Sequence, residues 1–157
     1  MDFSKITESL YIGTTPRTED YQTLRDLGVE LVINMRIERP PYPDLVESPL
    51  SVLWLPTFDS PLVPIPLGAL FKGVRAALEK LEDGGKVYVH CAAGSHRGVA
   101  MGAAILIALG YEPQEAMQRI KQNREIADPY IWYIRRRILR FADKWNNHRE
   151  AIPSSSN

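Results

Sequence analysis

The segment from His90 to Gly98 combines the residue types that can bind and attack a phosphate group. The thiolate of Cys91 would be a strong nucleophile, and the guanidinium of Arg97 can hold two phosphate oxygens at once. A β-branched run, Lys86 to His90, precedes this segment, and an apolar helical pattern, Gly98 to Leu109, follows it. Such a loop between strand and helix directs backbone N–H groups inward, and the helix N-terminus adds positive partial charge. We therefore expect a phosphate cradle with Cys91 inside it.

The backbone amides of this loop are expected to share the phosphate with Arg97, and Gly94 would supply the unusual backbone angle that lets the loop curl. The predicted substrate-binding residues are Ala92, Ala93, Gly94, Ser95, His96 and Gly98. Cys91 is the single cysteine of the chain, which excludes an intrachain disulfide framework and a multi-cysteine zinc site. No metal and no cofactor are expected, because Arg97 and the amides would supply the positive charge.

The order His90-Cys91, five residues, Arg97 resembles the signature of protein tyrosine and dual-specificity phosphatases. The stretch Ile6–Gly13 resembles that family's opening strand, and Val32-Ile33-Asn34 and Arg124 are also similar to its members. The resemblance implies hydrolysis of phosphomonoesters in two steps through a phosphocysteine, with Cys91 as nucleophile and Arg97 as phosphate clamp. It also implies that His90 organises the loop. His96 is expected to face outward near the rim.

The mechanism implied by the resemblance needs a carboxylic acid on an upstream loop to protonate the leaving oxygen. Asp59 lies in the proline-rich stretch Pro56–Pro66 and is the predicted general acid, and then the general base for the attacking water. Asp44, in the earlier proline-rich loop, is the weaker candidate. A loop aspartate by itself is usually a solvated turn former, so this assignment depends on the Cys91 motif.

Gly98 is a departure from the family pattern, which commonly has Ser or Thr directly after the arginine. The hydroxyl of that residue helps the thiolate to leave when the phosphocysteine is hydrolysed, so the second step is expected to be slow here. Two further hypotheses stay open beside the phosphatase. One is a module that binds phosphorylated partners with little turnover, and the other is a rhodanese-like or arsenate-reductase-like thiol enzyme, although arsenate reductases need further cysteines.

The expected substrates are phosphotyrosine in proteins, with phosphoserine and phosphothreonine where the cleft is shallow. The neutral loop residues Ala92, Ala93 and Ser95 offer no lysine for a highly charged inositol headgroup. Arg36 and Glu38, however, are similar to an atypical subgroup that hydrolyses inositol pyrophosphates. A small phosphorylated molecule such as an inositol pyrophosphate is therefore the alternative substrate.

The rest of the chain predicts the elements that must position these residues. Strands are expected around Leu10–Ile12, Val29–Asn34, Val52–Leu55 and Lys86–His90, and helices from an N-cap at Thr18 and over about 67–81, 98–109, 114–123 and 130–146. Prolines exclude regular structure from 37–50 and 56–66. This alternation predicts a single α/β domain, residues 1–150, with a central mostly parallel sheet flanked by helices, and a disordered tail, 151–157.

Composition limits the partners of the chain. Its 19 basic and 19 acidic residues balance, which argues against a protein that binds nucleic acid by neutralising many phosphates. No apolar run is long enough to span a bilayer, and the N-terminus lacks the pattern of a signal peptide. We therefore expect a cytoplasmic enzyme with no membrane or nucleic-acid partner.

Overall fold

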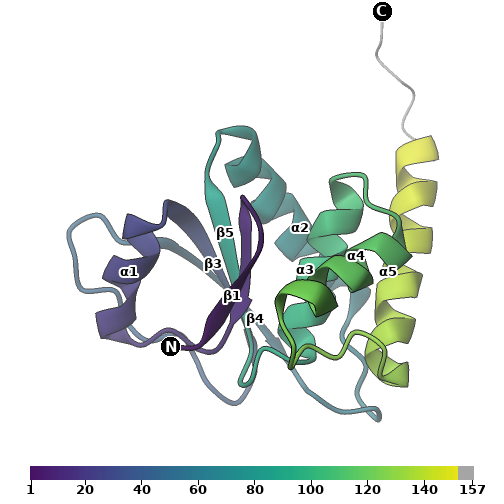
Figure 1. Cartoon of the computed structure of the whole chain (residues 1–157), viewed down its shortest axis with the longest axis horizontal. Coiled ribbons are helices and arrows are strands. Elements are labelled where there is room, and N and C mark those ends of the chain that lie inside the picture. The colour runs from purple at the N-terminus through teal and green to yellow at the C-terminus, as the bar shows by residue number, and fades with distance from the viewer. Residues whose placement is uncertain (152–157) are drawn as a thin grey trace, which may run out of the picture.

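A five-stranded sheet forms the centre of the computed structural model, which describes residues 1–151 (Figure 1). The strand order is β1-β2-β5-β3-β4, with β1 Phe3–Thr7, β2 Leu10–Gly13, β3 Val29–Arg36, β4 Ser51–Thr57 and β5 Lys86–His90. The β1 strand is antiparallel to β2, and every other neighbouring pair is parallel. The expected mostly parallel sheet is confirmed. Its middle strand, β5, leads directly into Cys91.

Helices cover both faces of the sheet (Figure 1). The short helices η1 (Thr18–Asp20) and α1 (Tyr21–Asp26) lie on one face, where Tyr21 and Leu24 pack with Val32 and Tyr88. The helices α2 (Leu67–Glu82), α3 (Arg97–Ala108), α4 (Pro113–Asn123) and α5 (Trp132–Ala151) form the larger core on the other face. Alternate residues of β3 and β5 face these two cores, as the period of a strand requires.

The helix that follows the phosphate loop is the most deeply buried helix of the fold. Every residue of α3 from Arg97 to Ile107 is buried, and the helix contacts α2, α4 and α5 as well as β2 and β5. The loop between Cys91 and His96 is therefore fixed at both ends by buried elements. Among the described residues, no helix combines the length and apolarity that crossing a bilayer requires.

Two boundaries differ from those expected. Thr18 does not cap a helix: it begins the one-turn η1, and its hydroxyl donates to the carbonyl oxygen of Pro43 at 2.8 Å. The last helix continues past Asn146 to Ala151. The expected disordered tail, residues 151–157, lies outside the described residues apart from Ala151.

The β4 strand also runs further than its sequence pattern predicted, through Pro56 to Thr57. β4 is an edge strand, so the missing N–H of Pro56 need not break a ladder hydrogen bond. Thr57 is buried, and its hydroxyl donates to the carbonyl oxygen of Met35 on β3 at 2.5 Å. This extension carries the end of β4 to the phosphate loop.

Candidate active site

The loop from Cys91 to His96 curls between the end of β5 and the start of α3. Cys91 is 3% exposed, whereas Ala92 and Ala93 are exposed at the surface. Gly94 has a φ of 68°, in the left-handed region that favours glycine, as expected. A Cβ atom there would lie 2.8 Å from Nη2 of Arg124 and 2.9 Å from the carbonyl oxygen of Gly13. The curl therefore requires glycine at this position.

Three consecutive carbonyl groups of this loop are bound from outside. The buried Arg124 donates from Nη2 to the oxygen of Ala93 and from Nε to that of Gly94, each at 2.9 Å. The backbone N–H of Asp128 donates to the oxygen of Ser95 at 2.9 Å. In a trans peptide unit the N–H points opposite to the C=O. The amides of residues 94–96 therefore point away from these partners, toward the inside of the loop, where an anion would be bound.

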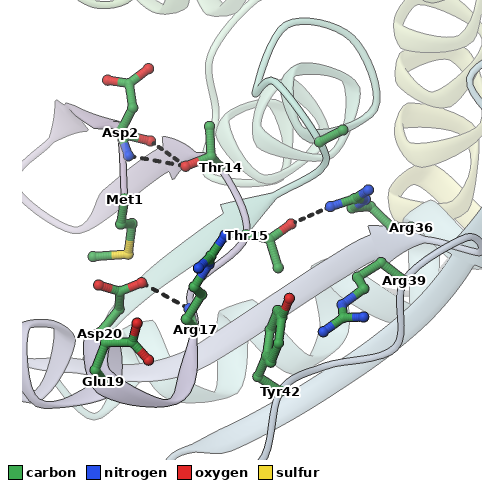
Figure 2. Close-up of a pocket in the computed structure, with 11 residues that line it drawn as sticks. Met1, Asp2, Thr14, Thr15, Arg17, Glu19, Asp20, Arg36, Arg39 and Tyr42 are labelled. Carbon is green, nitrogen blue, oxygen red and sulfur yellow. Dashed lines mark hydrogen bonds between the residues drawn. The ribbon is translucent and has the colours of Figure 1, made fainter.

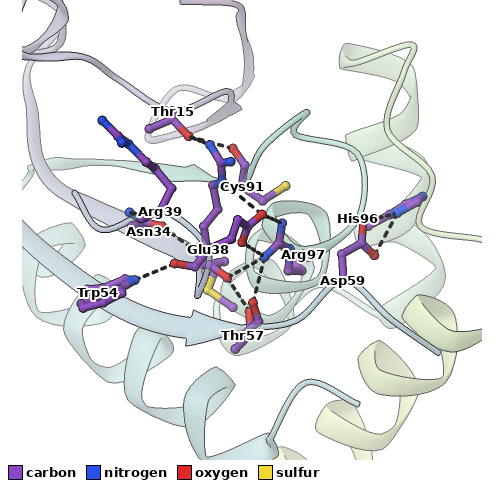
Figure 3. Close-up of polar contacts among 12 residues, drawn as sticks. Thr15, Asn34, Glu38, Arg39, Trp54, Thr57, Asp59, Cys91, His96 and Arg97 are labelled. Carbon is purple, nitrogen blue, oxygen red and sulfur yellow. Dashed lines mark hydrogen bonds and ion pairs between the residues drawn. The ribbon is translucent and has the colours of Figure 1, made fainter. Parts of the chain in front are cut away.

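Arg97 is buried and is held by its own set of acceptors (Figure 3). Its Nη1 donates to Oε1 of Glu38 at 2.7 Å and to the carbonyl oxygen of Thr57 at 2.8 Å, and its Nη2 donates to Oε2 of Glu38 at 2.9 Å. These hydrogen bonds from Arg97 lower the pKa of Glu38 to about 2. Nε of Arg97 is buried and has no partner among the described residues. A guanidinium has five N–H donors, so the edge formed by Nε and Nη2 keeps two donors for a phosphate.

Asp59 meets the end of the phosphate loop, beside His96 (Figure 3). Nδ1 of His96 lies 3.0 Å from Oδ2 of Asp59, and the hydroxyl of Tyr133 on α5 donates to Oδ1 at 2.7 Å. Burial and this hydrogen bond raise the pKa of Tyr133 to about 12, so the phenol keeps its proton at neutral pH. The side chain of His96 therefore faces Asp59 at the rim of the loop. The sequence predicted an outward-facing side chain near this rim.

Asp44, the weaker candidate for the general acid, has different hydrogen-bond partners from Asp59. It accepts hydrogen bonds from Nη2 of Arg25 on α1 and from the backbone N–H of Leu50, the latter at 2.8 Å. Burial acts to raise the pKa of Asp44, but the Leu50 N–H and the Arg25 guanidinium together hold it below its usual value. A carboxylate kept ionised in this way is suited to fixing a loop and poorly suited to donating a proton. This arrangement favours Asp59 as the acid.

His90, the last residue of β5, brings no positive charge to the neighbouring Cys91. Its side chain is buried, and Nδ1 has no hydrogen-bond partner within residues 1–151. Burial lowers the pKa of His90 to about 3, so the ring is neutral at pH 7. The ring packs against Tyr88, with centroids 6.0 Å apart. The neutral ring therefore lies beside the loop without adding charge to it.

Two contacts of this site were not predicted from the sequence. The pairs Glu38–Arg97 and Tyr133–Asp59 are separated by 59 and 74 residues, and no local pattern links their members. Glu38 was noted only for a family resemblance, and Tyr133 was not noted. Within the described part of the chain, no group of three or more His, Cys, Asp or Glu side chains is arranged to hold a metal ion.

The domain combines a buried cysteine, a loop of inward-facing amides and an arginine that keeps two N–H donors for a phosphate. This combination defines an α/β domain of the cysteine-dependent phosphatase class. The family model described as dual specificity phosphatase, catalytic domain, matches residues 10–141. The chain belongs to this family, and the resemblance drawn from the His90–Arg97 motif is confirmed.

Individual relatives agree with this assignment. The human phosphatidylglycerophosphatase and protein-tyrosine phosphatase 1 is 33% identical over 133 residues, which are 78% of this chain and 64% of that protein. Dual specificity protein phosphatase 2 of Mus musculus is 29% identical over 122 residues, 76% of this chain but only 37% of the relative. A crystal structure of PTPMT1 superposes with a TM-score of 0.83 at 25% identity, covering 96% of this chain and all of that one.

Proposed function

We propose that the chain hydrolyses phosphomonoesters without a metal ion, through a phosphocysteine on Cys91. The observation that carries this proposal is the arrangement at Arg97: it leaves two N–H donors free beside a loop whose amides at residues 94–96 point inward. Such fixed donors stabilise the charge on a phosphoryl group during transfer and need no reorganisation.

Two steps follow from this arrangement. The Cys91 thiolate attacks phosphorus, the bond from phosphorus to the ester oxygen breaks, and Asp59 gives its proton to the leaving oxygen. A water molecule then attacks the phosphocysteine and passes a proton to Asp59. The sulfur–phosphorus bond breaks, releasing inorganic phosphate and restoring the thiolate. Tyr133 and His96 would hold the Asp59 carboxyl at the edge of the loop.

The substrate belongs to one of two classes. Family membership favours phosphotyrosine, phosphoserine or phosphothreonine in a protein. The name of the human relative pairs a protein-tyrosine phosphatase with a phosphatidylglycerophosphatase, so non-protein phosphomonoesters occur among similar proteins.

The test is hydrolysis of phenyl phosphate in the presence of a metal chelator. We expect wild-type turnover, none with Cys91→Ser, and a kcat about 10²-fold to 10⁴-fold lower with Asp59→Ala, the range expected for loss of a general acid. Asp143→Ala, an exposed aspartate of α5, is the matched control and should keep wild-type turnover. Asp44→Asn should also keep turnover, because Asp44 is engaged with Arg25.

Two results would oppose the proposal. Turnover that survives Cys91→Ser would exclude a phosphocysteine intermediate. Absence of wild-type turnover, with tungstate still bound at the loop, would instead make the chain a module that captures phosphate groups.

A further inference from the structure

A hollow of about 500 Å³, here called the α5 hollow, lies between α5 and the loop that follows β4. It is lined by Pro61 and Pro64 of that loop and, on α5, by Trp132, Tyr133 and three arginines. The hydroxyl of Tyr133 donates to Asp59 at 2.7 Å, so the α5 hollow adjoins the proposed general acid. No residue of the phosphate loop lines it. The α5 hollow is therefore a surface beside the candidate active site and separate from the phosphate cradle.

The α5 hollow carries an unbalanced positive charge, because its lining holds Arg136, Arg137 and Arg140 and no carboxylate. Within residues 1–151, none of the three forms an ion pair. Nε of Arg137 donates to the carbonyl oxygen of Ile65 at 3.0 Å, which holds that guanidinium against the loop. Burial lowers the pKa of Arg137, and the charges of Arg140 and Arg136 lower it further, so the three cations repel one another. An acidic ligand would relieve this repulsion.

A larger cavity beside the phosphate loop differs in this respect (Figure 2). It has a volume of about 590 Å³ and opens at Ala92. Its charged lining residues are three arginines and three carboxylates: Arg17, Arg36, Arg39, Asp2, Glu19 and Asp20. A hollow of about 440 Å³ that adjoins the α5 hollow at Arg136 and Arg140 includes the carboxylate of Asp143. Of these three spaces, the α5 hollow is the one whose charge selects for an acidic ligand.

Exposed apolar side chains border these arginines. Trp132 is 61% exposed, and its ring meets that of Tyr133 edge to face, with centroids 5.8 Å apart. Leu62 and Val63, between the two prolines of the loop, are 88% and 44% exposed. Tryptophan and arginine are among the residues most enriched where proteins bind one another. The α5 hollow and its border therefore have the composition of a protein-binding surface.

The shape and the location of the α5 hollow favour an extended peptide over a lipid bilayer. The side chains of an extended segment alternate, so it can place an apolar side chain on Trp132 and carboxylates beside the arginines. A bilayer surface is smooth on this scale and would leave a hollow of about 500 Å³ unfilled. Because Tyr133 contacts Asp59 and also lines the α5 hollow, a segment bound there reaches the phosphate loop within a few residues.

We propose that the α5 hollow docks an acidic segment of a phosphoprotein substrate, close in sequence to its phosphorylated residue. An apolar side chain of the segment packs on Trp132, and its carboxylates pair with Arg136, Arg137 and Arg140. This inference rests on the proposed function only for the statement that the partner is a substrate. Exposed ion pairs are individually weak, so the preference for an acidic segment is the sum of several pairs and decreases as salt screens them.

The experiment compares two phosphotyrosine peptides. In one, glutamates and a leucine stand on each side of the phosphotyrosine, and in the other, glutamines replace the glutamates. Calorimetry measures their affinity for the Cys91→Ser protein, and initial rates measure kcat/KM with the intact enzyme. We expect the glutamate peptide to be preferred by about threefold to 30-fold in both measurements, the combined effect of several exposed ion pairs. The preference should decrease as the NaCl concentration rises.

Variants of the α5 hollow test where this preference arises. The double substitution Arg136→Gln, Arg140→Gln should remove most of it, and Trp132→Ala should weaken binding of both peptides, since both carry the leucine. Arg119→Gln, at an exposed arginine of α4, is the matched control and should keep the wild-type preference. A preference that survives the double substitution would overturn the inference, and so would equal binding of the two peptides by the protein with an intact α5 hollow.

Phosphatidylcholine vesicles with and without phosphatidylserine test the other occupant, an anionic bilayer. Binding to the phosphatidylserine vesicles that depends on Arg136 and Arg140, without a preference between the two peptides, would make the α5 hollow a membrane contact and overturn the inference. Failure to hydrolyse phenyl phosphate would contradict the proposed function alone, because binding to the Cys91→Ser protein still decides whether the α5 hollow takes an acidic segment.

Discussion

Gly98 stands directly after Arg97, and the space around it would accept a side chain. A Cβ atom there would lie 3.5 Å from Sγ of Cys91 and 3.4 Å from its backbone nitrogen, which is ordinary van der Waals contact. We predict that Gly98→Ser speeds hydrolysis of the phosphocysteine several-fold, because a hydroxyl beside the sulfur can donate to the departing thiolate. Rapid-quench kinetics with an aryl phosphate would check this, since a slow second step gives a burst followed by a slower steady state.

Gly98→Ala is the matched control, because it adds the same Cβ without a hydroxyl. Both substitutions should favour the first turn of α3 by removing the flexibility of glycine, so stability cannot explain a difference between them. If the alanine variant accelerates the second step as much as the serine variant, the hydroxyl is not responsible.

The segment that carries Asp59 is positioned by α5. The hydroxyl of Tyr133, at the start of that helix, donates to Asp59 at 2.7 Å. We predict that Tyr133→Phe lowers kcat by about twofold to tenfold, because the Asp59 carboxyl loses the hydrogen bond that positions it, and such a bond contributes roughly 0.5–1.5 kcal/mol. As a positioning effect, the loss should grow as the leaving group becomes more basic and needs the proton of Asp59 more.

Rates for a series of aryl phosphates with leaving groups of different pKa would measure this dependence. Tyr130→Phe, at an exposed tyrosine just before α5, serves as the control and should follow the wild-type series. A Tyr133→Phe rate reduced equally for all leaving groups would place the effect elsewhere, in folding or in phosphate binding.

At the scale of the whole molecule, two groups of the site make stability depend on pH. Burial lowers the pKa of His90 from its ordinary 6.5 to about 3, so between these values the folded state excludes a proton that the unfolded chain accepts. The stability that depends on neutral His90 is complete above pH 6.5 and is lost as pH falls toward 3. Arg97 lowers the pKa of Glu38 from 4.5 to about 2. The stability that depends on ionised Glu38 is therefore lost as pH falls from 4.5 toward 2.

We predict that the free energy of unfolding falls by a few kcal/mol between pH 7 and pH 3, at about 1.36 kcal/mol per pKa unit for the buried His90. Glu38 contributes less than this rate, because solvent screens its partly exposed carboxylate. Urea unfolding at several pH values would measure it. His90→Gln should flatten the slope between pH 6.5 and 3, whatever its effect on stability at pH 7. For comparison, His148→Gln alters an exposed histidine and should retain the wild-type slope. Equal slopes for wild type and His90→Gln would contradict the assignment.

The sequence by itself determined the chemistry of the loop and the class of the fold. Cys91, Gly94 and Arg97 lie within seven consecutive residues, between a β-branched strand and an apolar helix. The conformations that build such a cradle depend on neighbouring residues: a positive φ needs glycine, and a helix start presents its own N–H groups. The alternation of strands and helices likewise follows from local periodicity, and the mostly parallel sheet from that alternation.

Only the tertiary structure decided what surrounds the loop. Glu38 binds Arg97, Arg124 and Asp128 hold the loop carbonyls, and Tyr133 holds Asp59. The tertiary structure also decided which charged residues lie near the loop. The neutral residues of the loop argued against a highly charged substrate, yet the parallel pairing of β3 with β5 brings Arg36 to the cavity beside Ala92. Backbone preferences act over a few residues, whereas the electrostatic surroundings of a site are set by segments that only packing brings together.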